Sequence, residues 1–219
     1  MRQALITAGT ATIFSAGLTL PVRAADGSVK LAVKETRFKF REPLVRRSRT
    51  DAIIIHHVGG TDQEVPAAKI HQWHLANKWA GIGYHYVIHK DGTVERGRPM
   101  NAVGAHCYEH NHNTVGICFA GDYERAVPTD AALASGTVLM AYICKTYGIK
   151  PGAKTILGHR DLSGTLCPGR NLYRQLGNIR TGPSIVNSKR GGYICIRPFY
   201  AAVRKGFPNF FVYFPCRER

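Results

Sequence analysis

The segment DAIIIHHVGG, residues 51–60, places three isoleucines and two histidines directly before a pair of glycines. A short run of β-branched residues that ends in glycine is typical of a buried strand followed by a turn. Because side chains alternate along a strand, His56 and His57 are expected to face opposite sides of the sheet. The segment therefore predicts a central strand with one histidine on each face at its carboxyl end.

Strand and helix patterns alternate along the chain around this segment. The next helix is expected to begin at a cap supplied by Thr61 or Asp62, and a longer helix at a cap supplied by Thr129. Strands interleaved with substantial helices predict an α/β domain over residues 51–180, with a single mixed β-sheet flanked by helices. The expected strands cover residues 51–58, 83–89, 93–96, 114–120 and 155–157, and the expected helices cover residues 64–79, 130–147 and 172–179.

The charge of the chain is concentrated at its two ends. The 219 residues include 30 Lys and Arg against 14 Asp and Glu, which gives a net charge of +16. Ten basic and three acidic side chains precede residue 51, and seven basic and one acidic follow residue 180, whereas the middle holds 13 basic, 10 acidic and all ten histidines. A nearly balanced middle without a basic and aromatic strip argues against a specific nucleic-acid partner and against a metal-dependent nuclease.

The two ends also differ from the middle in composition. Residues 1–24 combine an early arginine, a weakly apolar run and small residues, which is typical of a secretory signal; a membrane anchor through residues 4–22 is the alternative. We therefore expect an exported protein of the periplasm, cell wall or extracellular space. Residues 25–50 form a basic lead-in, and residues 181–219 a basic, aromatic-rich extension. These flanks are expected to attract anionic cell-envelope polymers through long-range electrostatics.

Six cysteines leave two interpretations open. An even number fits three disulfides in an oxidising compartment, but full pairing fails if one cysteine binds a metal. Cys118 and Cys144 stand within apolar runs and are expected to be small buried residues.

The segment GHRDLSGTLCPG, residues 158–169, holds His159 and Cys167 eight positions apart in a loop rich in turn residues. Imidazole and thiolate are preferred zinc donors, and the histidine pair at the end of the first strand is a natural source of a third ligand. Three protein ligands leave a fourth position for water, as in catalytic zinc sites. We therefore expect a zinc site in a cleft at the strand ends.

Five segments occur in an order that resembles the type-2 N-acetylmuramoyl-L-alanine amidases, a family that includes phage lysozymes with amidase activity and peptidoglycan recognition proteins. The resemblance implies a zinc amidase domain over residues 51–180 that holds one Zn²⁺. It also implies peptidoglycan or muropeptide as partner, and cleavage of the amide between the lactyl group of muramic acid and L-alanine. The segments are DAIIIHHVGG, IHQWH, GIGYHYVIHKDGTVERGR, VGAHCYEHNHNTVGICFAGDY and GHRDLSGTLCPG.

The resemblance also implies roles for single residues. It assigns the metal ligands to His56, His159 and Cys167, and the catalytic tyrosine to Tyr84. Two positions before the cysteine ligand, phage lysozymes have lysine and recognition proteins with amidase activity have threonine; this chain has Thr165. Tyr84 is expected to position water or to donate a hydrogen bond, and Thr165 to donate to the developing oxyanion.

Two further residues, His106 and Asn113, are expected by similarity to line the cleft and contact sugar or peptide. His85 alternates with Tyr84 and is expected on the opposite side of the sheet, in the core. The alternative function is a recognition protein that binds muropeptide without cleaving it. Retention of Cys167 argues against this alternative, because members that only bind typically lack this ligand.

Overall fold

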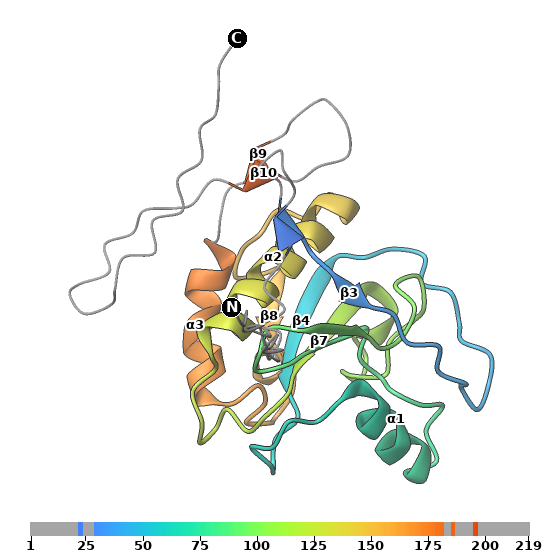
Figure 1. The fold of residues 1–219 in the computed structure, drawn as a ribbon. Helices are drawn as coiled ribbons and strands as arrows, with labels where there is room; N and C mark the ends of the chain where they lie inside the picture. The colour runs from blue at the N-terminus through green and yellow to red at the C-terminus, as the bar shows by residue number, and fades with distance from the viewer. Residues whose placement is uncertain (1–21, 24–28, 182–184, 187–194, 197–219) are drawn as a thin grey trace, which may run out of the picture.

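A six-stranded sheet forms the centre of the computed structural model, which describes residues 22–23, 29–181, 185–186 and 195–196 (Figure 1). Of its five strand pairings only one is antiparallel, that between β5 and β6, so the predicted mixed sheet is confirmed. In their order across the sheet, the strands are β3 (Val33–Lys34), β6 (Val94–Arg96), β5 (Tyr86–Ile88), β7 (Thr114–Phe119), β4 (Ala52–His57) and β8 (Ile156–Gly158).

Two short strand pairs lie outside this sheet. They are β1 (Val22–Arg23) with β2 (Val29–Lys30), and β9 (Ile185–Val186) with β10 (Cys195–Ile196). Apart from these strands and Thr181, the expected signal or anchor segment and the C-terminal extension lie outside the described residues.

Helices cover the two faces of the sheet unequally (Figure 1). α2 (Asp130–Tyr147) and α3 (Arg170–Arg180) pack over the larger apolar core, which includes Ile53 and Ile55 of β4. α1 (Ala67–Ala76) packs over a smaller cluster on the other face. Because side chains alternate along β4, His56 points to the α1 side, where only one helix covers the sheet.

The long helix α2 has the boundaries that its sequence predicts. The hydroxyl of Thr129 accepts a hydrogen bond from the backbone N–H of Ala132 at 3.2 Å, which is the geometry of a helix N-cap. The helix ends at Gly148, whose φ of 67° places it in the left-handed region that glycine favours.

The predicted start of α1 is wrong. The helix begins at Ala67 after Pro66, and neither Thr61 nor Asp62 caps it. A carboxylate from a distant strand supplies the acceptor instead, because Oε2 of Glu95 in β6 accepts the backbone N–H of Ala67 at 2.7 Å. The helix therefore starts where tertiary contact, rather than local sequence, satisfies its first N–H groups.

The interpretation of residues 25–50 as a lead-in outside the domain is also wrong for their described part. β3 pairs in parallel with β6 and forms one edge of the sheet. Arg47 is buried, and its guanidinium donates to the carbonyl oxygens of Ala102 at 3.0 Å and Thr114 at 3.1 Å. The segment 31–50 is therefore a structural part of the domain.

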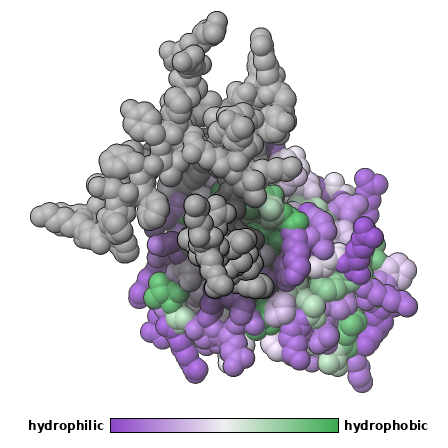
Figure 2. Space-filling view, in the orientation of Figure 1, coloured by the Kyte–Doolittle hydropathy of each residue, from purple (hydrophilic) through white to green (hydrophobic). Residues whose placement is uncertain are grey.

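Hydrophilic side chains dominate the described part of the surface in Figure 2, and hydrophobic ones form small, separate patches. None of the helices in the described part of the chain combines the length and apolar character that a membrane span requires.

Candidate functional site

Parallel strand ends bring the three candidate metal ligands together. His56 is the penultimate residue of β4, and His159 begins η2 (His159–Asp161) directly after β8. Since β4 and β8 are parallel neighbours, their carboxyl ends meet at one edge of the sheet. The loop after η2 returns Cys167 to the same place, where the N–H of Arg160 donates to its carbonyl oxygen at 2.8 Å. One ligand atom from each of the three residues lies within 4.8 Å of the others.

The distances within this group fit a zinc ion. Nδ1 of His56 lies 3.7 Å from Sγ of Cys167, and the ring centroids of His56 and His159 are 4.5 Å apart. In a tetrahedral site, bond lengths of about 2.0–2.1 Å to nitrogen and about 2.3 Å to sulfur separate two such ligands by about 3.6 Å. Two imidazoles and one thiol are also the donor chemistry that zinc prefers.

Burial sets the protonation states of the ligands. It lowers the pKa of His56 well below its ordinary value, with a further contribution from the charges of His159 and His57, and it also lowers the pKa of His159. Burial raises the pKa of the Cys167 thiol to about 12. The two imidazoles are therefore neutral, as ligands must be, whereas the thiol ionises at neutral pH only with a cation beside it.

The neighbouring His57 points away from this group, as strand alternation predicts. Its Nδ1 accepts the backbone N–H of Tyr123 at 3.1 Å and lies 3.8 Å from Oδ1 of Asp122. Its own backbone N–H donates to Sγ of Cys167 at 3.5 Å, so the residue contributes to the site through its main chain.

Tyr84 and Thr165 both lie beside the ligands. The ring centroid of Tyr84 is 5.1 Å from that of His56, and burial raises the pKa of its phenol well above the ordinary value. The hydroxyl of Thr165 accepts the backbone N–H of Cys167 at 3.2 Å. Its own proton therefore remains available for another acceptor.

His85 is fully buried, as expected, but it does not point away from the site. Its ring centroid lies 5.8 Å from that of His106, while Tyr84 contacts His56. The predicted alternation between Tyr84 and His85 fails because β5 begins only at Tyr86, so both residues belong to an irregular approach to the strand.

The structure brings His106 into direct contact with a metal-ligand candidate. Its side chain is buried, and its Nδ1 lies 3.1 Å from Nε2 of His56. The residue thus lies behind His56, against the ring nitrogen that does not face Cys167.

Asn113 does not join the ligand group, and its expected contact with sugar or peptide stays a prediction. It ends η1 (Asn111–Asn113) and donates from Nδ2 to Oδ2 of Asp51 at 2.8 Å. Asn113 precedes β7 and Asp51 precedes β4, so both lie about 17 Å from the level of His56, at about 3.3 Å for each of five residues.

Asn111 is the asparagine that supports the site, and the sequence reasoning missed it. Its Oδ1 accepts the backbone N–H groups of His106 at 2.7 Å and Cys107 at 3.0 Å, which fixes the loop that carries His106. The available signal was the tendency of asparagine in a polar loop to bond nearby main-chain N–H groups.

Cys107, Cys118, Cys144 and Cys167 are free thiols, and Cys118 and Cys144 are buried as predicted. No disulfide joins them, so any pairing that involves Cys195 or Cys216 is outside this description.

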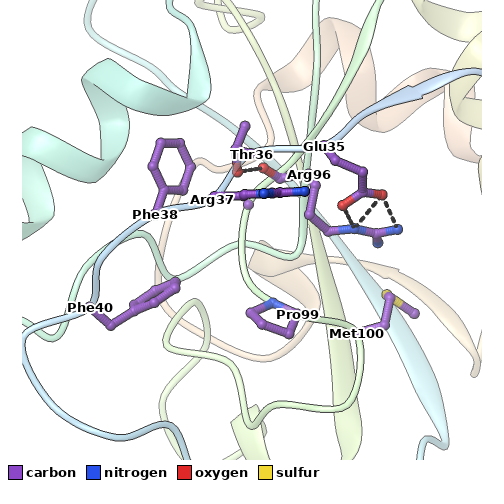
Figure 3. A pocket seen from close by; sticks show the side chains of 9 residues that line it. Glu35, Thr36, Arg37, Phe38, Phe40, Arg96, Pro99 and Met100 are labelled. Atoms are coloured by element: carbon purple, nitrogen blue, oxygen red, sulfur yellow. Dashed lines mark hydrogen bonds and ion pairs between the residues drawn. The ribbon is translucent and has the colours of Figure 1, made fainter.

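A cavity of about 420 Å³ lies elsewhere, beside β3 and β6 (Figure 3). Arg96 and Glu35 both line it and pair at 3.1 Å. None of the candidate site residues lines this cavity, so we place no part of the chemistry there. Its lining consists of Glu35, Thr36, Arg37, Phe38, Phe40, Arg96, Gly97, Pro99 and Met100.

Comparison with known proteins identifies the family. Residues 46–170 match the family model described as N-acetylmuramoyl-L-alanine amidase. The chain belongs to this amidase family. Among its relatives is the endolysin of Escherichia phage T7, which is 33% identical over 131 residues, covering 59% of this chain and 87% of that protein.

Two solved structures extend the family assignment to the fold. The N-acetylmuramoyl-L-alanine amidase LysCS from Clostridium intestinale is 31% identical with a TM-score of 0.62, covering 67% of this chain and 93% of that chain. A mutant of Drosophila PGRP-LB in complex with tracheal cytotoxin is 27% identical with a TM-score of 0.58, covering 64% and 87%. The resemblance to this amidase family is therefore confirmed, and peptidoglycan amidase activity is the activity that the family supports.

Proposed function

We propose that the protein hydrolyses the amide bond between the lactyl group of N-acetylmuramic acid and the L-alanine of the stem peptide, with one Zn²⁺ bound by His56, His159 and Cys167. The observation that carries this proposal is the meeting of three zinc-type ligand atoms at one edge of the sheet in a chain of the amidase family. The named activity of the Clostridium amidase supports the bond that is cleaved, and the similarity to PGRP-LB in complex with tracheal cytotoxin supports a cell-wall ligand.

Zinc would supply Lewis-acid polarisation of the amide carbonyl and would lower the pKa of the attacking water. The phenol of Tyr84 is protonated at neutral pH, burial raises its pKa further, and it lies beside His56, where it would donate a hydrogen bond to the attacking water or to the carbonyl oxygen. Thr165 uses a lone pair for the N–H of Cys167 and directs its proton toward the carbonyl oxygen that gains charge. A positioned donor of this kind contributes about 10²–10³ in rate.

Mass spectrometry of digested peptidoglycan tests the proposal. With zinc present we expect free stem peptides that begin with L-alanine and glycan strands with intact muramic acid; a zinc chelator should suppress both. No free stem peptide, or the same release with chelator as without it, would contradict the proposed reaction.

Binding without cleavage is the second candidate function, and the structural similarity to a recognition protein solved with tracheal cytotoxin favours it. A muropeptide affinity column, run beside the digestion, distinguishes the two functions. A chain that retains muropeptide on a column but releases no peptide when loaded with zinc would be a recognition protein.

We also propose that a basic face binds anionic cell-envelope polymers. This face consists of the exposed side chains Arg37, Lys39, Arg41, Lys69 and Lys78. The chain segment at its centre lies along α1: the carbonyl of Lys39 contacts His71 at 3.2 Å, and Arg41 donates to the carbonyl of Leu75 at 2.8 Å. Residues 36–41 and 65–82 contain no acidic side chain, and of the acidic residues that flank them Glu35 pairs with Arg96 and Glu64 with His89.

Replacing Arg37, Lys39 and Arg41 together by glutamine is expected to weaken sedimentation with cell-wall sacculi at low salt by up to about 100-fold, at about 1 kcal/mol for each cation near an anionic surface. Turnover of a soluble muropeptide should not change, because these charges attract the protein to the anionic wall and are not part of the ligand group.

The matched control replaces three exposed lysines near the end of α2, Lys145, Lys150 and Lys154, by glutamine. Equal weakening by both triple variants would show that total charge, rather than the basic face, governs binding. Truncation is unsuitable here, since residues 31–50 hold an edge strand and the buried Arg47.

A further inference from the structure

His106 has both ring nitrogens committed to other groups of the protein. We propose that it is a positioning residue that fixes the tautomer and ring orientation of His56, so that His56 presents Nδ1 to the metal. The proposal rests on the zinc role proposed above for His56. It assigns His106 a different task from the contact with sugar or peptide that similarity implies.

The first step is the direction of the hydrogen bond between the two histidines. Nδ1 of His56 faces Sγ of Cys167 at 3.7 Å, and Nε2 faces Nδ1 of His106 at 3.1 Å. A neutral imidazole that binds a metal through Nδ1 carries its proton on Nε2. His56 is therefore the donor, and Nδ1 of His106 is the acceptor.

The second step follows the proton on the far side of His106. With Nδ1 as acceptor, neutral His106 carries its proton on Nε2, which lies 3.5 Å from Oγ1 of Thr114. The hydroxyl of Thr114 donates to the carbonyl oxygen of His110 at 2.5 Å, so its lone pairs are free to accept. One consistent direction thus runs from His56 through His106 and Thr114 to a backbone carbonyl.

The third step is the confinement of the His106 ring between two glycines. A Cβ atom at Gly104 would lie 2.4 Å from Cδ2 of His106, and one at Gly116 would lie 2.4 Å from its Cγ. The side-chain oxygen of Asn111 accepts the backbone N–H of His106 and so holds the main chain at this residue. The imidazole therefore fits closely in one orientation, which is what a group that orients a metal ligand requires.

Burial argues against a direct substrate contact. His106 is only 9% exposed, and its two nitrogens are occupied by His56 and Thr114. Residues that hydrogen-bond to a metal ligand typically contribute about 10–100-fold to metal affinity or activity.

A pair of nearly isosteric variants tests the proposal in the full chain. His106→Asn keeps an acceptor near the position of Nδ1, whereas His106→Leu has a similar branched shape without one. We expect His106→Leu to weaken zinc binding about 10–100-fold in competition with a chromogenic chelator, and His106→Asn to restore most of that loss. At saturating zinc, His106→Leu should recover most of its kcat, with KM for muropeptide little changed.

The control is His112→Leu, which makes the same change at an exposed histidine of the same loop and is expected to leave zinc affinity unchanged. Wild-type zinc affinity in both His106 variants, together with a raised KM, would overturn the proposal in favour of substrate contact. Equal loss of zinc by both variants would also overturn it. Zinc affinity is measured without substrate, so these outcomes do not depend on whether the amide is cleaved.

Nitrogen-15 NMR of the zinc-loaded wild-type protein tests the proposal without any substitution, so a folding defect of a variant does not affect it. The expected spectrum shows His106 as a neutral imidazole protonated on Nε2, and His56 with a proton on Nε2 that exchanges slowly. A proton on Nδ1 of His106 would overturn the proposal.

Discussion

Replacement of Cys167 by serine is expected to abolish tight zinc binding and amide cleavage together. The thiol lies 3.7 Å from Nδ1 of His56 and supplies the sulfur ligand of the group. A serine hydroxyl does not ionise at neutral pH and is a much poorer zinc ligand than a thiolate. The loss of zinc affinity should exceed the roughly 100-fold upper range for changing a residue that only orients a ligand.

The measurements are zinc content after gel filtration and release of stem peptide from peptidoglycan. Cys144→Ser is the matched control, because it removes a buried thiol from α2, away from the ligand group. We expect it to lower the melting temperature while zinc stays stoichiometric. If Cys167→Ser kept stoichiometric zinc and cleaved normally, the proposed ligand set would be incorrect.

The strands and helices that local signals define could be predicted closely. The run that contains Ile53, Ile54 and Ile55 forms the central strand, and Thr129 and Gly148 bound α2 as expected. These features depend on residues adjacent in the chain, such as a β-branched run, a hydroxyl cap or a glycine that adopts positive φ.

Features that depend on distant partners could not be predicted. The start of α1 depends on Glu95, which is 28 residues away. The membership of β3 in the sheet depends on pairing with β6 across some 60 residues. The local sequence indicates neither contact. A basic, proline-containing segment such as residues 25–50 therefore predicts a lead-in rather than an edge strand.

The donor types of the site could be predicted, but their arrangement could not. Histidine and cysteine indicate zinc wherever they converge, and the ends of parallel strands favour that convergence for His56 and His159. The orientation of His106 depends on the space left by two glycines and on the position of Asn111, which only the assembled fold determines. For the same reason, the sequence does not predict that Asn111 fixes the loop that carries His106.

Replacement of Glu95 by glutamine is expected to destabilise the fold by about 3 kcal/mol, the largest stability effect that we predict. The carboxylate is 5% exposed and lies 3.0 Å from Nε2 of His89 and 2.9 Å from Nζ of Lys34. It also accepts the first N–H of α1. The contact with His89, followed by the hydrogen bonds from Lys34 and Ala67, outweighs burial and lowers the pKa of Glu95 from 4.5 to about 2.

The two pKa shifts predict how this loss depends on pH. Because the pKa of Glu95 is lowered on folding, its stabilisation is present above its ordinary value of 4.5 and disappears as the pH falls through about 2. Burial lowers the pKa of His89, but Glu95 and Glu64 outweigh burial and raise it, so its stabilisation is complete below 6.5 and disappears as the pH rises through the raised value. The difference between wild type and Glu95→Gln should therefore be largest between pH 4.5 and pH 6.5.

Urea unfolding from about pH 3 to about pH 8, with chelator in all samples, measures this difference without a contribution from zinc release. Glu109→Gln is the matched control, because it removes one carboxylate from an exposed position, and we expect it to change the unfolding free energy by less than about 0.5 kcal/mol. Two results would contradict the role of Glu95: parallel pH profiles for wild type and Glu95→Gln, or a loss no larger than that of the control. Because Glu95 bonds to β3 through Lys34 and to α1 through Ala67, loss of its charge should loosen both elements, and hydrogen exchange should rise first at the amino end of α1.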